Sequence, residues 1–517
     1  MSFRFNPFLL TVVLLVVLNA CSTTGPGSVV FQPVEPDLTP RAETDERISD
    51  QELRDPSDRS LAETIELSSN MSVYQPDVAL EILRSLESVP SSQLTAMIDS
   101  QTQDPEFTEW LELALQARTL MTNGDSTSAA AQKWSDYHYG HVITRARYSE
   151  LIRSYSALFP APSQVAILLP TEGGLAAASK AIRDGIVSAY LEQPGNSSIR
   201  FYSSGESGES AIAAYLQARE DGATQIVGPL RLESTRALAE LDDLSVPILL
   251  LNEPGNDKSA RPDQTTIVNS LALSQAEEAA AIANGAIAHG QKHALLIVPN
   301  DAWGRRVETA FATIFEQGEG RVSASSYFST ATSDHSEMLT QLLKISESTQ
   351  RKTDLQAQLG IPLTFEPTRR DDFDFIFLAA RPKQGRELKP LLRFHDAGDV
   401  PVYAMGRIYS GKTVQASDQD LNGVVFPTTS WQLKTAGVAV NTPDSVRDGA
   451  FGNLYALGRD AWSVLPWLPL MQKDPDLWFS GNVGELQLQT DGRLYRQPAW
   501  AQFSAGLPIP YQWSDKP

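Results

Sequence analysis

The only cysteine of this 517-residue chain, Cys21, stands where a thiol can be modified with lipid. A charged start at Arg4, an apolar run over residues 8–18 and the small residue Ala20 precede it. Spanning a bilayer takes roughly 18 apolar residues or more, so residues 1–20 are predicted to be a signal peptide that is removed. A small residue before a lone cysteine is the pattern of a bacterial lipobox. We therefore predict that Cys21 is diacylated and becomes the acylated N-terminus; the alternative is an ordinary signal peptide with an incidental cysteine.

The residue after the cysteine bears on where such an anchor would hold the protein. Ser22 occupies the position at which an aspartate usually keeps bacterial lipoproteins in the inner membrane. Several acyl chains, at about 0.8 kcal/mol for each buried methylene group, keep a protein on a membrane essentially permanently. We therefore expect the protein to be lipid-anchored at the periplasmic face of the outer membrane of a Gram-negative cell.

Apart from Cys21, the sequence holds no motif that is typical of a catalytic, metal or nucleotide site. Gly173 and Gly174 follow an apolar run, but without GxGxxG spacing or a GK[ST] ending, which favours a tight turn. The six histidines form no HExxH motif, and no GxSxG or SxxK motif is present. We expect no catalytic residue, no cofactor and no metal, and hence no enzyme. The alternative is a set of scattered Ser, His and Asp side chains that converge in space.

Charge and cysteine content further restrict the classes of function and the sources of stability. The chain has 42 Lys and Arg against 63 Asp and Glu, a net charge of -21. Nucleic-acid binding needs clustered Lys and Arg against the phosphates, so a nucleic-acid partner is not expected. With a single cysteine the chain cannot form an internal disulfide, so its stability must come from burial of apolar side chains.

A few aromatic and cationic residues are candidates for contacting a partner protein. They lie beside expected strands, and the carboxyl ends of strands face the crevice of open α/β sheets. Tryptophan and arginine are also common energetic anchors of interfaces. The candidates are Trp303, Arg305, Arg369, Arg370 and Trp431. The alternative for each is an aromatic cap or a solvated charge on the lobes.

The elements that must position these residues fall into three regions. Residues 21–59, rich in Gly, Pro, Ser and acidic residues, are predicted to be a disordered tether. From 60 to 160 the apolar period is helical, with a capping box at Ser60 and Glu63 and a helix start at Asp104-Pro105. Five or six short helices in antiparallel pairs predict a small tetratricopeptide-like domain, with a generic helical domain as the alternative.

Residues 164–517 are predicted to form an α/β domain with two lobes. The run 165–169 is apolar throughout, as in a strand buried on both faces of a parallel sheet, and a helix is expected over 174–190. Further strands are expected near 199–202, 225–227, 247–251, 294–298, 373–378, 400–404 and 424–426. About 350 residues are too many for one core, which predicts a cleft between two lobes. Lobe I is placed at about 164–270 and 400–475, and lobe II at about 271–399 and 480–510.

Several of these stretches resemble known proteins. The α/β part resembles type I periplasmic binding proteins, and the whole chain resembles the LpoA family of outer-membrane lipoproteins that activate class A penicillin-binding proteins. The stretches that carry the resemblance are 165–170, 181–185, 227–230, 303–306, 359–360, 365–374, 401–404, 420–424, 491–493 and 498–501. The helical region, about 100 residues long, is shorter than is usual in that family. We expect the tether to supply part of the missing reach.

The resemblance implies a non-enzymatic regulator that docks on a bifunctional peptidoglycan synthase, a class A penicillin-binding protein, and stimulates its transpeptidase. The alternative is a periplasmic solute-binding protein for a small amino acid, as the fold alone would suggest. In such receptors, hydroxyl-bearing residues after the early strands hold the ligand. Here the stretch 250–254 lacks the expected Ser or Thr, and its Glu253 would oppose a carboxylate.

The lipid anchor is directly testable. Mass spectrometry of the N-terminal peptide of the mature protein should find Cys21 acylated and residues 1–20 absent. A Cys21→Ala variant should be released from the membrane fraction, because no acyl chain then holds it. An unmodified Cys21 in the mature wild-type protein would contradict the prediction.

Overall fold

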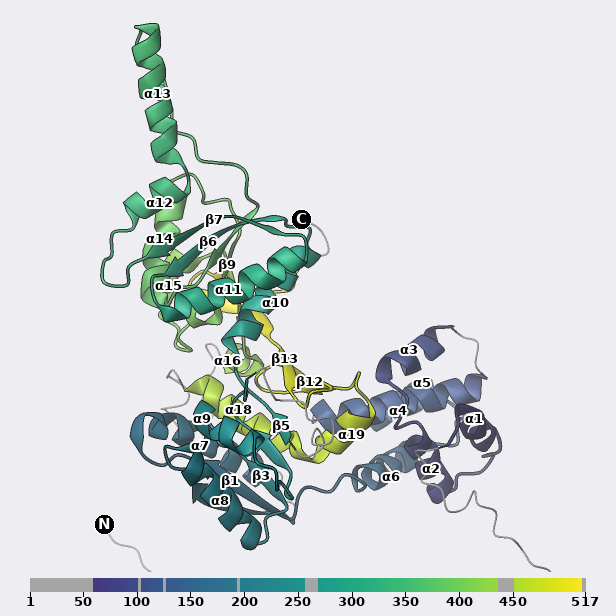
Figure 1. Ribbon diagram of the computed structural model, residues 1–517. Coiled ribbons are helices and arrows are strands. Elements are labelled where there is room, and N and C mark those ends of the chain that lie inside the picture. The colour runs from purple at the N-terminus through teal and green to yellow at the C-terminus, as the bar shows by residue number, and fades with distance from the viewer. Residues whose placement is uncertain are drawn as a thin grey trace, which may run out of the picture. The chain divides into compact units, whose positions relative to one another are not determined.

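The computed structural model describes residues 59–100, 104–123, 127–192, 196–255, 268–435 and 451–513. The predicted signal peptide, Cys21 and nearly all of the predicted tether lie outside these ranges. The described residues belong to one compact unit, Arg54–Pro517 (Figure 1). Among their helices, none combines the length and apolar character that crossing a membrane requires.

Six helices form the first part of the described chain. They are α1 (Leu61–Ser69), α2 (Pro76–Ser85), α3 (Ser91–Ser100), α4 (Pro105–Asn123), α5 (Thr127–Tyr137) and α6 (Arg145–Ser156). The capping box is confirmed, because the Ser60 hydroxyl accepts from the Glu63 backbone N–H and the Glu63 carboxylate accepts from the Ser60 backbone N–H. The predicted helix start is confirmed as well, since α4 begins at Pro105.

Large aromatic side chains fill the centre of this helical part. Phe107 and Trp110 of α4, Trp134 of α5 and Tyr148 of α6 are all at most 1% exposed. The indole N–H of Trp134 donates to the Ile143 carbonyl at 2.8 Å, which satisfies its one polar atom inside the core. The helices therefore pack on one shared core.

Lobe I is built on a five-stranded parallel sheet. Its strands are β1 (Gln164–Leu169), β2 (Ser198–Ser203), β3 (Gln225–Val227), β4 (Ile248–Leu250) and β5 (Val268–Ser270), in the order β2-β1-β3-β4-β5. Its helices include α7 (Ala176–Glu192), α8 (Gly208–Glu220) and α9 (Leu232–Ala239). Alternate side chains of β1 enter two different cores, Ile167 one and Leu168 the other. This explains why the run 165–169 is apolar throughout.

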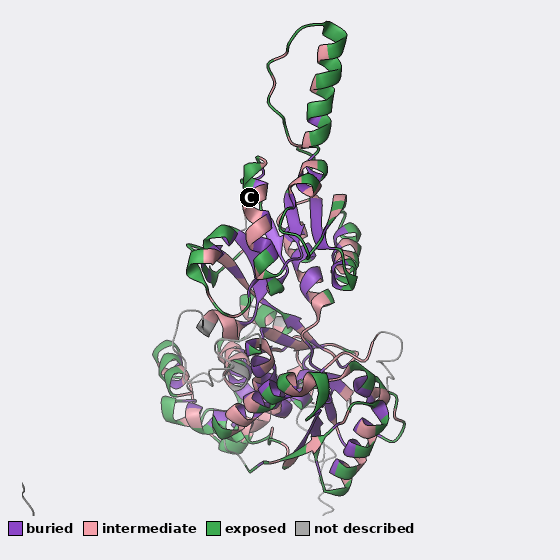
Figure 2. Ribbon diagram, turned by 90° about the vertical axis from the view of Figure 1, so that its left-hand side faces the viewer, coloured by how far each residue is buried: buried purple, intermediate pink, exposed green. Residues whose placement is uncertain are grey.

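Lobe II is built on a seven-stranded mixed sheet, whose central strands are buried (Figure 2). Its strands are β6 (His293–Pro299), β7 (Arg321–Phe328), β8 (Phe375–Leu378), β9 (Val402–Ala404), β10 (Val424–Thr428), β14 (Ala499–Ser504) and β15 (Leu507–Pro510), in the order β15-β14-β10-β9-β8-β6-β7. Its helices are α10 (Gln275–Ala288), α11 (Ala302–Gln317), α12 (Ser336–Leu342), α13 (Ile345–Leu359), α14 (Pro382–Phe394) and α15 (Gln415–Asp418). Figure 1 shows α13 reaching away from the other elements of this lobe.

The lobe boundaries expected from the sequence need a correction. The sequence places residues 400–475 in lobe I, yet β9 and β10 pair with each other and with β8 and β14 in the sheet of lobe II. An apolar run of a buried strand does not specify its neighbour. The short connection through α14 places β9 beside β8, as consecutive parallel strands usually are.

The last part of the chain returns to lobe I before it ends in lobe II. The helices α16 (Ser430–Thr435), α18 (Gly452–Ser463) and α19 (Leu468–Lys473) precede a small antiparallel sheet of β11 (Trp478–Ser480), β12 (Glu485–Leu488) and β13 (Leu494–Gln497). The apolar side chains of β12 and β13 join the core that lobe I shares with the helical part. The range 480–510 is therefore divided, because only β14 and β15 belong to the sheet of lobe II.

Two glycines allow α7 and α18 to cross in backbone contact. A Cβ added at Gly185 of α7 would lie 2.1 Å from the Tyr455 carbonyl oxygen of α18. Reciprocally, a Cβ at Gly458 would lie 2.1 Å from the Ile182 carbonyl oxygen. Any side chain at either position must push the helices apart.

Replacing Gly185 with alanine should therefore destabilise the protein, although alanine is the better helix former. We expect a loss of about 1–3 kcal/mol in the free energy of unfolding, measured by urea denaturation followed by circular dichroism. Gly174→Ala is the matched control, because nothing lies within 4 Å of its added Cβ. Equal stability of the two variants would contradict the backbone contact.

Candidate functional site

The five residues singled out in the sequence do not come together as one site. Trp303 follows the start of α11, where the Asp301 carboxylate accepts from the Gly304 N–H at 2.8 Å. Its side chain is only 8% exposed, and its indole N–H donates to the Gln275 side-chain oxygen at 3.2 Å. Trp303 therefore belongs to the core between α10 and α11 rather than to an open surface. Arg305 is exposed and donates to the Asn300 side-chain oxygen at 3.2 Å.

The other three candidates are engaged with their own neighbours. Arg369 donates to the Asp396 carbonyl at 2.6 Å, and Arg370 donates to both carboxylate oxygens of Asp372 at 2.6 and 2.7 Å. The hydrogen bonds from Arg370 lower the pKa of Asp372 to about 2. The Trp431 ring lies 5.1 Å from the ring of Tyr455 on α18. These residues stabilise loops and helix contacts and leave only part of their surface exposed.

A cleft lies between the carboxyl ends of the strands of the two lobes, and it contains two adjoining hollows. The first, of about 380 Å³, is lined by the loops after β3, β4 and β5, by α18 and by Arg306 of α11. The lobe I side is mostly apolar. Its amide side chain, Asn252, donates to the Leu230 carbonyl at 3.0 Å and accepts from the Glu253 N–H at 2.9 Å, so both its polar atoms are used within the loop.

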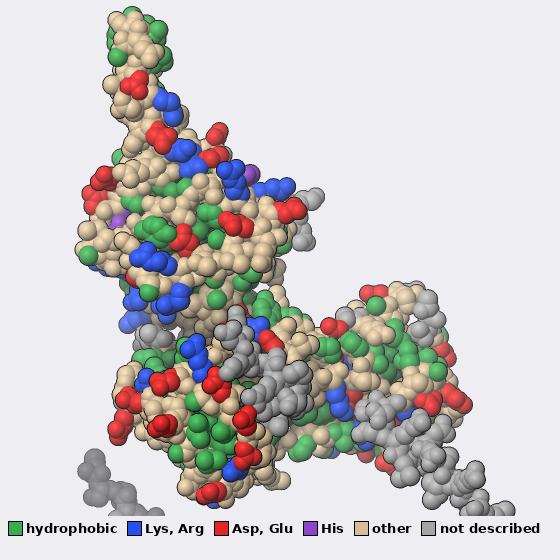
Figure 3. All heavy atoms as spheres, viewed as in Figure 1, with side chains coloured by type: hydrophobic (Ala, Val, Ile, Leu, Met, Phe, Trp, Pro, Cys, Tyr) green, Lys and Arg blue, Asp and Glu red, His purple; other side chains and the backbone are tan. Residues whose placement is uncertain are grey.

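The second hollow has a volume of about 680 Å³, and we call it the arginine hollow. Among the described residues, Arg381, Arg407 and Arg496 line it together with the carboxylate of Glu278. Glu278 is 8% exposed, accepts from the Gly406 N–H at 2.6 Å and lies 3.8 Å from Arg496. Burial raises the pKa of Glu278. Lys and Arg side chains gather at the lower edge of lobe II, under α11 in the view of Figure 3.

The pKa of the preceding residue on α10, Glu277, is also perturbed. Burial, reinforced by the negative charge of Glu253, raises the pKa of Glu277 to about 7. A carboxyl group with this pKa is largely protonated under mildly acidic conditions.

The helical part joins lobe I through a buried ion pair. Arg118 of α4 is 2% exposed and pairs with Asp474, which is 0% exposed and follows α19. The guanidinium also donates to the Leu86 carbonyl at 2.6 Å and to the Val89 carbonyl at 3.0 Å. Asp474 accepts from the Ser91 hydroxyl at 2.8 Å. Both charges are thus surrounded by hydrogen-bond partners, as buried charges require.

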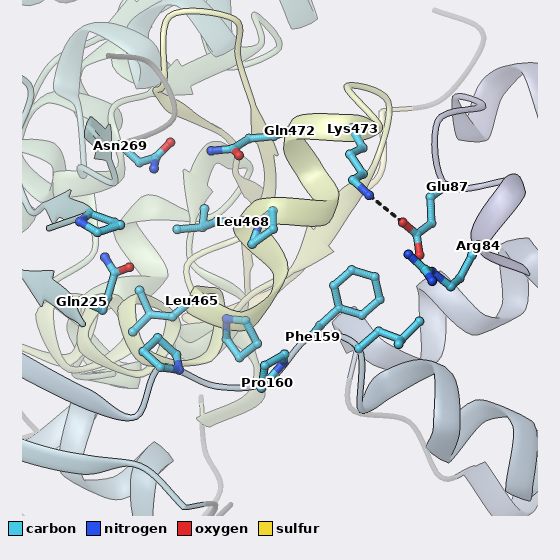
Figure 4. A pocket seen from close by; sticks show the side chains of 15 residues that line it. Arg84, Glu87, Phe159, Pro160, Gln225, Asn269, Leu465, Leu468, Gln472 and Lys473 are labelled. Atoms are coloured by element: carbon cyan, nitrogen blue, oxygen red, sulfur yellow. Dashed lines mark hydrogen bonds and ion pairs between the residues drawn. The ribbon is translucent and has the colours of Figure 1, made fainter. Parts of the chain in front are cut away.

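A third hollow, of about 490 Å³, lies beside this joint (Figure 4). Phe159, Pro160, Leu465 and Leu468 line it, and Lys473 pairs with Glu87 at 2.8 Å at its edge. The two parts are therefore joined by apolar contacts and by two ion pairs that cross between them, Arg118–Asp474 and Lys473–Glu87.

Sequence reasoning missed Arg118, although a signal was present. Phe107, Leu111, Ala114 and Arg118 fall on one face of α4 at helical spacing, so Arg118 occupies a core position where a charge needs a partner. The identity of that partner, Asp474, carries no local signal.

The architecture now defines the class of protein. A helical part is followed by a parallel sheet and a mixed sheet, and the chain crosses between the two sheets three times beside a cleft. This is a two-lobed α/β protein of the periplasmic-binding-protein type with an N-terminal helical part, and the predicted fold class is confirmed. The chain belongs to the LppC family, because the family model described as "LppC putative lipoprotein" matches residues 52–506.

Relatives and solved structures agree with this assignment. The protein named "Penicillin-binding protein activator LpoA" from Vibrio antiquarius is 25% identical over 457 residues, which cover 84% of this chain and 72% of the relative. Full-length LpoA from Haemophilus influenzae superposes with a TM-score of 0.51 at 21% identity, over 84% of this chain and 78% of that one. The C-domain of LpoA from the same organism, described as a regulator of PBP1A, has a TM-score of 0.52 at 21% identity, over 68% of this chain and 100% of that one. The solved structures support the fold.

The buried joint leads to a stability prediction. Arg118→Met should lower the free energy of unfolding by about 3–5 kcal/mol, because it leaves the Asp474 carboxylate buried without its counter-charge. The double variant Arg118→Met/Asp474→Leu should recover much of that loss. Urea denaturation measures both.

A surface pair provides the matched control for this experiment. Arg219→Met removes the partner of Asp243, whose side chain is 81% exposed, and should change stability by less than about 1 kcal/mol. A loss for Arg118→Met no larger than that for Arg219→Met would contradict the role of the joint.

Proposed function

We propose that this protein is a non-enzymatic outer-membrane lipoprotein that binds a class A penicillin-binding protein and stimulates peptidoglycan transpeptidation. The observation that carries the proposal is the match of the LppC family model over residues 52–506, which includes both the helical part and the two lobes. Relatives of this family that cover most of the chain are named activators of penicillin-binding proteins.

The buried joint supports a role in protein–protein contact. The helical part and lobe I share one apolar core and the Arg118–Asp474 pair. They therefore move as one body, so a partner that binds one of them meets the other in a fixed position. Such a scaffold suits a protein that acts by presenting a fixed surface.

We propose that the partner contacts this chain at separate points, the exposed Arg305 first, followed by the partly exposed Arg369, Arg370 and Trp431. Trp303 contributes little surface and instead holds the start of α11, which carries Arg305. An arginine at the centre of an interface supplies charge-assisted hydrogen bonds, which are among the larger single contributions to binding.

The regulator would act only through a difference in affinity for two states of its partner. A protein that binds the active and inactive forms of an enzyme equally does not shift the balance between them. Preferential binding to the active synthase raises transpeptidation without any catalytic group on this chain. We further propose that the lipid on Cys21 and the tether 21–59 hold the body of the protein at a distance from the outer membrane, and that residues 60–160 form a tetratricopeptide-like domain.

The decisive experiment is a pull-down with a purified class A penicillin-binding protein, paired with a transpeptidation assay. The wild-type protein should retain the synthase and increase the fraction of cross-linked product. Arg305→Ala combined with Arg369→Ala should weaken retention by about fivefold or more, as truncation of interface anchors typically does.

Arg153→Ala is the matched control, because Arg153 is exposed on α6, away from the proposed surface. It should leave both retention and cross-linking unchanged. Failure of the wild-type protein to retain any class A synthase would contradict the proposal. Unchanged retention by the Arg305/Arg369 variant would show that these two residues do not contact the synthase.

A further inference from the structure

The arginine hollow has more positive charge than its surroundings neutralise. The guanidinium groups of Arg381 and Arg407 are exposed and form no hydrogen bond or ion pair with any residue in the described ranges. The third arginine, Arg496, is 5% exposed, and its Nε atom has no hydrogen-bond partner there. In a chain with a net charge of -21, three arginines beside the one carboxylate that lines this hollow within the described ranges are an unusual concentration of cations.

The topology explains how Arg381 and Arg407 of the hollow come close to each other and to Arg306 of the adjoining hollow. Arg306 follows β6, Arg381 follows β8 and Arg407 follows β9, and these three strands are parallel in the sheet of lobe II. The carboxyl ends of parallel strands lie at one edge, so the loops after them converge there. Arg381 and Arg306 lie close enough to Arg407 to lower its pKa, after the larger effect of burial.

One of these arginines is held in place by a residue of the core. The Arg407 guanidinium lies over the Trp303 ring, 5.1 Å from its centre, and Trp303 is fixed by its hydrogen bond to Gln275. A cation held against an aromatic face loses little further freedom when it binds an anion. The arrangement is thus preorganised, and the repulsion among the arginines remains until an anion arrives.

We propose that the arginine hollow binds a small anionic molecule that carries carboxylate or phosphate groups. Guanidinium groups pair with both oxygens of such groups through parallel hydrogen bonds. The volume of about 680 Å³ lies within the range of small-molecule sites. Leu273, Pro382 and Leu454 on the wall would cover the apolar body of the same molecule. This site is separate from the proposed contact with a synthase.

Isothermal titration calorimetry with citrate, pyrophosphate and leucine tests the proposal. The wild-type protein should bind citrate or pyrophosphate, and the one preferred tells carboxylate from phosphate recognition. Arg381→Gln/Arg407→Gln should weaken that binding about tenfold or more, since it removes two charge-assisted contacts. Both side chains are exposed, so the variant should keep the wild-type circular dichroism spectrum.

Arg351→Gln is the matched control, because it removes an exposed arginine of α13 outside the cleft. It should bind as the wild type does. Absence of binding by both anions, binding that is unchanged in the Arg381/Arg407 variant, or binding of leucine alone would each overturn the proposal. Synthase retention by the same variant, measured separately, is expected to be unaffected.

Discussion

The buried pair of Arg118 and Asp474 is the constraint on which the arrangement of the molecule depends. The two residues lie 356 positions apart, yet each is the counter-charge that makes burial of the other possible. Because an isolated charge inside a protein costs several kcal/mol, the helical part and lobe I separate only if both charges return to water. Directional hydrogen bonds to the Leu86 and Val89 carbonyls also hold the Arg118 side chain against the segment after α2, and the Ser91 hydroxyl donates from the same helical part to Asp474.

The spacing of apolar residues made many helices and strands predictable, but it does not encode which elements pack together. Helix α4 and strand β1 each carry an apolar pattern that matches one type of element, and both were located from the sequence. The pattern of β9 is also that of a buried strand, but it does not encode which sheet receives it. The joint and the arginine hollow bring together residues from distant segments. Arg305 was singled out, whereas its neighbour Arg306, about 100° further around α11, is the one that faces the cleft.

The cleft and the outer surface serve different purposes in this interpretation. In open α/β sheets, ligands bind in the crevice outside the carboxyl ends of the strands. Here the loops of lobe I line the cleft with mostly apolar side chains, while Arg381 and Arg407 of lobe II and Arg496 of β13 supply the cations. A ligand that bridges the two walls would couple its own binding to the spacing of the lobes. Because lobe I shares its core with the helical part, such a change would reach both of these parts.

The return of the chain to lobe I has a consequence for biogenesis. Helix α18 packs against α7 through Gly185 and Gly458, and β12 and β13 complete the same core. Helix α18 and both of these strands follow the parallel strands of lobe II, β6 to β10, in the sequence. The core of lobe I is therefore incomplete until nearly the entire polypeptide has been synthesised. Lobe I therefore cannot complete its folding during synthesis from the N-terminus. Until its last elements are made, part of its apolar surface stays exposed, and such surfaces bind chaperones and promote aggregation.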